Sequence, residues 1–506
     1  MAGCSTTPKL TTEDRKRDIE YLAQWAKDYS PFVQLNEKHK GTPSVETLLS
    51  KYLEFAEQAQ SNEEFFQVVR CYFNVIGASG HAYLLSEDML KALKLGSLFG
   101  IMKLGDIKLH EYDQAVYWAR LSGSISKRAH PPFRIVHRQG EYFTDDEWQH
   151  DGTLIPAGSE ILKVNGMSCA SYLEFIKENT WLRYDAYPKD WTKEHLLIID
   201  EGPDFTGWHV DFLLPDSSTH RAFVPKIKGF PAPKEEKVHT VQPKANCTCL
   251  ELTEEVGYIR VKGFMTGPLS YVFRGFIKKD RVKIKRFLDH SRGRYRKLII
   301  DIRDNGGGLP QYGYHALISP FLKEGVTYNQ IAGIRRKYLS ETNKSFLRFL
   351  QKDCSTKKQY VMSIEEIEPP EGFDSKEWIF YNITRRIKPS NRYNFDGSLY
   401  VLINGGAGSA ADDYANAVKR IGFATLVGQN TGGGAAGYIG PPVLRLPASG
   451  MIFRVETELV INPDGSFNEL FGTPPDIKLE PADPPRSITT EELLEDEWIK
   501  KIIADL

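Results

Sequence analysis

The chain has 506 residues, of which 41% are apolar and 26% are charged, and its formal net charge is −1. This length exceeds one ordinary core and predicts about two to four domains. The apolar fraction is typical of a folded globular protein, and the near-zero charge does not indicate a nucleic-acid partner. Because no apolar run approaches the roughly 18–20 residues of a membrane-spanning helix, we expect no integral membrane segment.

The six cysteines are scattered through the chain and do not indicate a disulfide framework. Cys247 and Cys249 lack a second pair, so a zinc site is not predicted. We expect no metal and no cofactor.

The start of the chain, Met1-Ala2-Gly3-Cys4, is similar to the end of a bacterial lipoprotein signal, in which the cysteine carries the lipid. On that interpretation the protein is extracytoplasmic, either periplasmic or at the cell surface, with a lipid anchor at Cys4. An ordinary N-terminus explains these residues equally well, because the apolar segment that would decide is not part of this sequence.

Residues 1–95 are predicted to be helical, beginning with a capping-box pattern at Thr11 and Asp14. A predicted helix around residues 65–73 runs into a glycine-rich turn that contains His81. A histidine between such a turn and a short apolar strand can be aimed by rigid neighbours. Most histidines in such places are satisfied surface or core residues, so the stretch alone favours a structural role.

Residues 105–225 contain short predicted strands with one or two helices. An apolar strand at 161–164 ends in an Asn-Gly turn, and a predicted hairpin follows near 208–224. The pattern resembles a PDZ-like domain, a type of domain that binds an extended peptide at a sheet edge. Residues 226–246, rich in proline and charge, are interpreted as a linker.

From residue 247 the pattern changes to alternating strands and helices. A buried strand near 298–302 leads into Gly306-Gly307-Gly308, whose backbone amides are free to face an anion. The Gly-Lys-Ser or Gly-Lys-Thr of a phosphate loop is missing, so an oxyanion hole is the better interpretation. Residues 325–395 are long, charged and irregular in pattern, and either frame a substrate cleft or form a decorated surface.

A second glycine-rich turn follows the apolar run at 399–403 and presents Ser409 at the start of a predicted helix. Glycines permit a cramped turn, and a helix N-terminus supplies free N–H groups and a positive dipole end. This arrangement displays a nucleophile, but a serine that merely caps a buried helix is equally compatible with the stretch. The chain ends in a predicted amphipathic helix within the tail, 481–506.

Four motifs in order resemble the C-terminal-processing (tail-specific) serine peptidases. They are the strand and glycines at 298–308, the serine turn at 404–412, the strand at 424–428, and the Gly-x-x-Pro-Asp-Ile segment at 472–477. The resemblance implies an α/β, multi-domain protein. It would have a ClpP/crotonase-like β-β-α core at 247–480, an N-terminal helical region and an inserted PDZ-like domain.

Within this family one branch uses a lysine base, and Gly434 stands at that position here. The other branch includes the tricorn core protease and the retinoid-binding repeats of eye proteins, and has the Thr-Gly-Gly-Gly found at 431–434. It also has a Gly-His-Thr-type motif, which Gly80-His81-Ala82 is similar to. The resemblance therefore implies that His81 is the base. Glu469 and Ser79 would complete a tetrad.

The function implied is hydrolysis of peptide bonds in a protein or peptide substrate through an acyl-enzyme on Ser409. His81 would take the serine proton, and Glu469 would orient the pair. Backbone amides of Gly307, or Gly306, and of Ala410 would bind the oxyanion. The alternative is a non-catalytic binding protein for a hydrophobic small ligand or peptide on the same fold, as the retinoid-binding relatives suggest.

Overall fold

The structure, a computed structural model, describes fourteen stretches of the chain. These are residues 7–40, 44–76, 82–98, 109–125, 129–138, 141–173, 196–197, 206–228, 245–266, 275–338, 361–390, 392–434, 443–480 and 488–504. The described part combines helices with mixed sheets, which confirms the predicted α/β class. None of the helices in these stretches is both long and apolar enough to cross a membrane.

Helices make up the N-terminal region, as predicted. Their bounds are α1 Thr12–Tyr29, α2 Phe32–Lys40, α3 Val45–Gln58, α4 Asn62–Ile76, α5 Glu87–Leu98 and α6 Leu109–Ile125. Thr11 and Asp14 form the expected capping box, and α1 ends before Ser30. Helix α6 lies within the range expected to open the PDZ-like unit, but Trp118 on it packs in the N-terminal helical core.

A hairpin from late in the sequence completes this N-terminal core. Strands β20 (Val443–Arg445) and β21 (Ile452–Arg454) form the hairpin, and β1 (Tyr83–Leu84) pairs antiparallel with β21. Buried Asp18 of α1 accepts hydrogen bonds from the backbone N–H groups of Ala448 and Ser449, at 2.8 and 2.9 Å. The N-terminal helices are therefore tied directly to the C-terminal third of the chain.

The segment between residues 129 and 228 is a separate antiparallel unit. Its strands are β2 Ala129–His130, β3 Ile135–Arg138, β4 Glu141–Thr144, β5 Trp148–His150, β6 Thr153–Ile155, β7 Glu160–Val164, β8 Met167–Ser168, β9 Gly207–Leu213, β10 Thr219–Pro225 and β11 Ile227–Lys228. The main sheet has the order β10-β9-β7-β4-β3. Asn165 and Gly166 have positive φ angles of 50° and 82°, as a tight Asn-Gly turn requires.

The central sheet carries the two glycine-rich loops. Its strands are β12 Cys247–Thr253, β13 Val256–Val261, β14 Lys297–Asp301, β18 Ser398–Ile403, β19 Thr425–Gly428 and β23 Ile477–Lys478. All neighbours are parallel except β12 and β13. Because β14 and β18 are parallel neighbours, the loops that follow them emerge side by side at one edge of the sheet.

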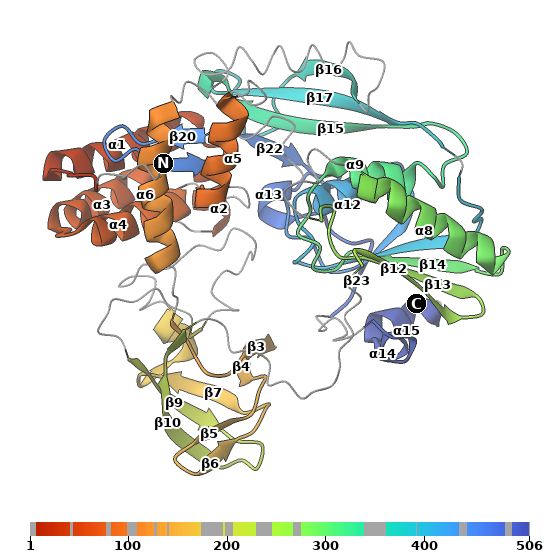
Figure 1. The fold of residues 1–506 in the computed structure, drawn as a ribbon, viewed down its shortest axis with the longest axis horizontal. Helices are drawn as coiled ribbons and strands as arrows, with labels where there is room; N and C mark the ends of the chain where they lie inside the picture. Colours follow the sequence, from red (N-terminus) through yellow and green to blue (C-terminus); the bar gives the residue numbers. More distant parts are fainter. Residues whose placement is uncertain are drawn as a thin grey trace.

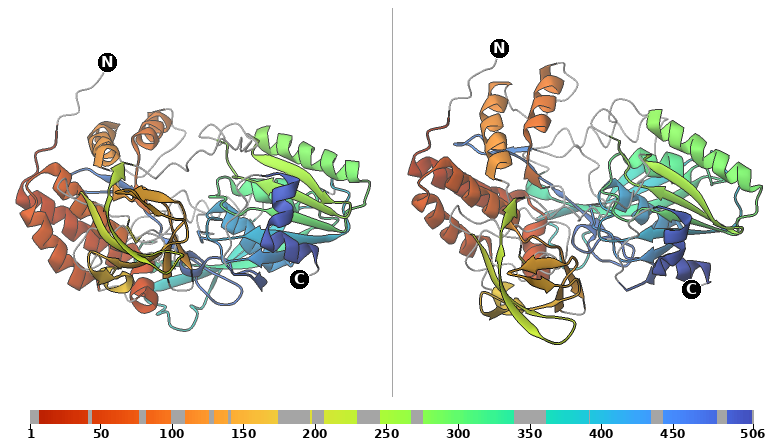
Figure 2. Two further views of the ribbon diagram at one scale, coloured as in Figure 1. Left: turned by 90° about the horizontal axis from the view of Figure 1, so that it is seen from below. Right: turned by 60° about the horizontal axis from the view of Figure 1, so that its bottom comes forward.

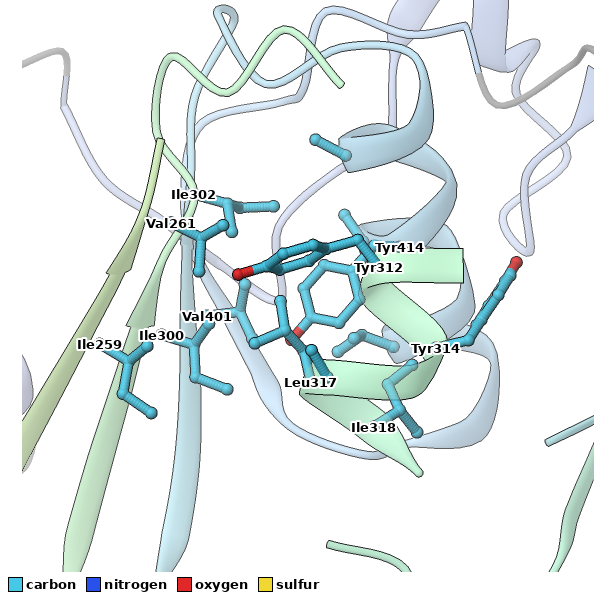
Figure 3. Packing of buried hydrophobic residues seen from close by; sticks show 14 of the residues in the cluster. Ile259, Val261, Ile300, Ile302, Tyr312, Tyr314, Leu317, Ile318, Val401 and Tyr414 are labelled. Carbon is cyan, nitrogen blue, oxygen red and sulfur yellow. The ribbon is translucent and has the colours of Figure 1, made fainter. Parts of the chain in front are cut away.

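The two faces of this sheet are covered by different helices. One face packs against α8 (Gly275–Ser291), α12 (Ala410–Ile421) and the π-helix η2 (Gly313–Ile318), which follows the short α9 (Pro310–Tyr312). Figure 3 shows Ile300 and Val401 of this face near the rings of Tyr312 and Tyr414. The other face, with Ile299 and Leu402, packs against the tail helices.

The tail forms two short helices, α14 (Thr490–Glu495) and α15 (Glu497–Ile503), rather than one continuous amphipathic helix. Asp496 separates them, because its carboxylate caps the start of α15 by accepting from the N–H groups of Trp498 and Ile499. Trp498 and Ile502 are buried against the sheet.

Residues 325–395 are more regular than expected. Three antiparallel strands, β15 (Val326–Arg335), β16 (Val361–Ile367) and β17 (Trp378–Ile387), extend from the core, and β15 also pairs with β22 (Glu458–Ile461). This sheet bridges the N-terminal helices and the core, which lie at opposite ends of the molecule in every view (Figures 1 and 2). The expectation of irregular structure was wrong for these strands.

Candidate active site

Ser409 stands at the junction between the turn after β18 and helix α12. Its backbone has φ 54° and ψ −124°, a conformation that costs an L-residue about 1–3 kcal/mol. Its side chain makes no capping hydrogen bond to α12, so the interpretation as a simple helix cap is not supported. A half-buried serine on a sharp strand-to-helix turn is the geometry of a nucleophile elbow.

Backbone hydrogen bonds hold this turn in place from two sides. The Ser409 N–H donates to the Gly433 carbonyl at 2.9 Å, and the Gly408 N–H donates to the Asn305 carbonyl at 3.0 Å. Asn404 and Asp304 form a reciprocal pair, since the Asp304 N–H donates to Asn404 Oδ1 at 2.9 Å and Asn404 Nδ2 donates to Asp304 Oδ1 at 2.8 Å. The surrounding loops therefore enforce the unusual backbone of the serine.

Gly307 lies against the serine turn, as the sequence led us to expect. A Cβ atom on Gly307, whose φ is 92°, would lie 2.6 Å from the Gly408 carbonyl oxygen, 2.8 Å from the Ala410 amide nitrogen and 2.8 Å from Ser409 Cβ. Only glycine fits this close approach. The structure thus brings together three of the residues named from the sequence.

The backbone N–H groups proposed to bind an oxyanion differ in the hydrogen bonds that they make in this structure. The Gly307 N–H donates to Asn305 Oδ1 at 3.0 Å. Ala410 is the first residue of α12, and a first helical amide has no acceptor within its own helix. Gly306 is exposed, and a Cβ atom there would meet nothing within 4 Å. Ala410 is therefore the donor that needs the least rearrangement.

Asp412 is a buried carboxyl in the first turn of α12, and sequence reasoning gave it no role. Its Oδ1 accepts from the hydroxyl of Thr431, from the Thr473 hydroxyl at 2.7 Å and from the Thr473 N–H at 3.2 Å. Burial raises the pKa of Asp412 despite these hydrogen bonds, and the charge of Asp413 adds to the rise. The carboxyl ties the Thr-Gly-Gly-Gly segment to the nucleophile helix.

Glu469 lies in the short helix α13 (Asn468–Phe471), with its backbone beside Gly433. A Cβ atom on Gly433 would lie 3.5 Å from the Glu469 Cα, and Gly433 is the residue whose carbonyl holds Ser409. Glu469 Oε2 accepts from the Val460 N–H at 2.9 Å, whereas buried Oε1 has no hydrogen-bond partner in the described part of the chain. Burial, followed by the charge of Glu456, raises the pKa of Glu469 well above its usual range.

His81 and Ser79 lie outside the described residues. Strand β1 begins at Tyr83, and it pairs with β21 so that Tyr83 faces Arg454. The chain continues from β21 through Glu456 to β22, whose Val460 donates to Glu469. The segment that follows the histidine motif is thus attached to the strand that leads to Glu469.

A buried polar network, also missed by sequence reasoning, connects α12 to the β15–β17 sheet. The Tyr314 hydroxyl donates to Asp413 Oδ2 at 2.6 Å and accepts from Arg385 at 2.9 Å, and Arg385 lies 3.8 Å from Asp413. Tyr328 reaches the same hydroxyl at 3.1 Å. The aromatic and β-branched pattern of β17 was the signal that could have revealed this sheet.

No group of three or more histidine, cysteine or acidic side chains in the described stretches is arranged to hold a metal ion. The groups that the structure places at the turn are the Ser409 side chain, the backbone amides of Gly307 and Ala410, and the buried carboxyl of Asp412.

Comparison with known proteins places this geometry in a family. Residues 255–479 match the model of peptidase family S41. The structure of mature CPAF complexed with lactacystin is similar over 97% of this chain and 97% of that chain, with 14% identity and a TM-score of 0.56. This likeness shows a shared fold over nearly the whole chain.

Two further structures are similar at lower scores. The photosystem II D1 C-terminal processing protease has 16% identity and a TM-score of 0.39, with 97% of this chain and 99% of that chain covered. The tricorn protease has 14% identity and a TM-score of 0.33, with 98% and 37% covered. No curated protein matches the sequence. Residues 255–479 of the chain therefore form a peptidase family S41 domain, the domain of a serine-type peptidase.

Proposed function

We propose that this peptidase cleaves peptide bonds through an acyl-enzyme on Ser409, with His81 as general base. The observation that carries the proposal is the enforced backbone of Ser409 at the start of α12, with Gly307 pressed against it. A serine hydroxyl is a weak nucleophile near neutral pH and needs a base within hydrogen-bond reach. His81 would take the serine proton and return it to the leaving amine.

Glu469 is the proposed orienting group for the histidine. Its Oε1 is buried and lacks a partner among the described residues, so it is available to accept an imidazole N–H. The raised pKa of Glu469 is consistent with this role, because an adjacent imidazolium would favour ionisation of the buried carboxyl. Ser79 would assist from the other side of the imidazole.

The oxyanion of the tetrahedral intermediate would be bound by the Ala410 amide together with Gly307 or Gly306. The Ala410 N–H sits at the positive end of α12, which favours negative charge there. The Gly307 N–H would exchange Asn305 Oδ1 for the substrate oxygen. Losing one such donor typically reduces the rate about 10²- to 10³-fold.

The antiparallel unit at residues 129–228 is proposed to act as a PDZ-like domain. Strands β3 and β10 are the edges of its main sheet, and an extended peptide can add to such an edge through backbone hydrogen bonds. The proposed substrate is therefore a protein or peptide tail, as in C-terminal processing. We also propose an extracytoplasmic location, with Cys4, which lies outside the described residues, as a lipid anchor.

The test is hydrolysis of a quenched fluorescent peptide library by the full chain and by Ser409→Ala and His81→Ala variants. We expect activity in the unmodified chain and at least a 10³-fold loss in each variant. Activity that survives both substitutions would show that another group performs the reaction. Absence of turnover together with a co-purifying apolar ligand would favour the binding-protein alternative.

A further inference from the structure

The two tail helices lie beyond the segment that matches the peptidase family, yet they pack against one face of the central sheet. Trp498, Ile499 and Ile502 pack there against the outward side of strands β13, β14, β18 and β19. Helix α15 is also fixed at its end by Lys297, the first residue of β14, which donates to the carbonyls of Ile502 and Ile503 at 2.7 and 3.0 Å. These contacts hold the tail against β14.

The other end of β14 is held by a buried ion pair. Arg303 is fully buried and donates to Asp496 Oδ2 through Nη1 and to Asp301 Oδ2 through Nη2, both at 2.7 Å. Its guanidinium carbon lies 5.3 Å from the centre of the Trp498 ring. Asp496 Oδ1 meanwhile caps α15, so both oxygens of this carboxylate are engaged.

Arg303 lies two residues before Asn305, and Asn305 contacts both glycine-rich loops. Its carbonyl accepts from the Gly408 N–H at 3.0 Å, and its Oδ1 accepts from the Gly307 N–H at 3.0 Å. Its Nδ2 donates to the Val261 carbonyl at 3.0 Å. A displacement of Arg303 would therefore move the backbone beside Ser409.

We propose that Asp496 is a positioning residue for catalysis, which holds Arg303 and thereby sets the position of the Gly306–Gly308 loop against Ser409. The inference rests on the proposed role of that loop in oxyanion binding. Apolar contacts already attach the tail to the sheet, and an ion pair buried this deeply adds little net stability compared with apolar groups of the same size. Its directed hydrogen bonds instead fix one position of the loop.

The test replaces Asp496 with asparagine, which keeps the size of the side chain but removes one of the two carboxylates that hold Arg303. We expect kcat to fall about 10- to 100-fold with KM within about twofold, because the substrate-binding surfaces are untouched while the loop is displaced. The rate of labelling by a fluorophosphonate probe should fall in parallel. Hydrogen exchange should increase in peptides covering residues 302–309, and not in those covering 207–213.

The matched control is Glu495→Gln. Glu495 is the neighbouring residue, is 80% exposed, and pairs only at the surface with Lys500 at 2.7 Å. It should leave kcat, labelling and exchange unchanged. Should Asp496→Asn fail to fold, the double variant Arg303→Lys with Asp496→Asn removes the bidentate link, keeps a cation beside Asp301 and keeps the side-chain oxygen that caps α15, and we expect the same loss of kcat.

The outcomes separate this inference from the proposed function. Suppose that the probe labels Ser409 in the unmodified chain, and that a folded variant, either Asp496→Asn or the double variant, has the same kcat and the same hydrogen exchange at 302–309 as the unmodified chain. The positioning role is then wrong and the proposed function stands. If the unmodified chain is not labelled at Ser409, both are wrong. A lower kcat in the variant, together with increased hydrogen exchange confined to residues 302–309, supports the positioning role.

Discussion

Replacing Gly307 with alanine tests how closely the loop after β14 approaches the nucleophile. At a φ of 92° an alanine is unfavourable by about 1–2 kcal/mol. The added methyl would lie 2.6 Å from the Gly408 carbonyl oxygen, and an ordinary contact begins at 3.4 Å, so the loops must separate by about 0.8 Å. The contacted atoms are backbone, which cannot swing away as a flexible side chain can. A misplacement of this size near the reacting atoms costs about 100-fold in rate.

The assay is kcat for peptide hydrolysis together with the thermal midpoint of unfolding. Gly405→Ala is the matched control, because Gly405 is exposed in the neighbouring glycine-rich turn after β18 and a Cβ atom there would meet nothing within 4 Å. We expect Gly307→Ala to lose about 100-fold in kcat, whereas Gly405→Ala stays within about twofold. A folded Gly307→Ala with the kcat of the unmodified chain would refute the inferred contact between the two loops.

Two other predictions concern buried carboxyls. Burial raises the pKa of Glu469 above the ordinary 4.5, so the contribution of the protonated carboxyl to stability is present at low pH and is lost as the pH rises through the raised pKa. In urea unfolding, Glu469→Gln should therefore gain stability over the unmodified chain as the pH rises above 4.5, while its kcat falls. A stability difference that does not change with pH would contradict this. Asp18→Ala leaves the N–H groups of Ala448 and Ser449 without their acceptor, so it should lower the free energy of unfolding by about 2–3 kcal/mol. It should also reduce kcat, because strand β1 pairs with the same hairpin. Unchanged urea unfolding would show that the hairpin is held by other contacts.

The local parts of the site could be predicted from the sequence. An apolar strand, a glycine-rich turn and a serine at a helix start are adjacent in the chain, so the arrangement around Ser409 follows from short-range rules. The approach of Gly307 to Ser409 also follows, because parallel neighbouring strands bring their following loops to one edge.

Contacts between residues far apart in the chain could not be predicted from the sequence in the same way. The charged composition of residues 325–395 hid strands β15 and β17, whose polar side chains such as Arg385 are buried in a network with the nucleophile helix. The pairing of Asp496 with Arg303, 193 positions earlier in the chain, is also not revealed by any local pattern. The proposed contacts of His81 and Ser79 remain predictions.

The central claim is that Ser409 is a nucleophile activated by His81, a residue more than 300 positions earlier in the chain. The most direct measurement is mass-spectrometric mapping of the adduct formed by a fluorophosphonate probe, in the unmodified chain and in His81→Ala. The account predicts a single adduct on the peptide that contains Ser409, formed at least about 10³ times more slowly without the imidazole. An adduct on another serine, or labelling of Ser409 at an unchanged rate in His81→Ala, would contradict it.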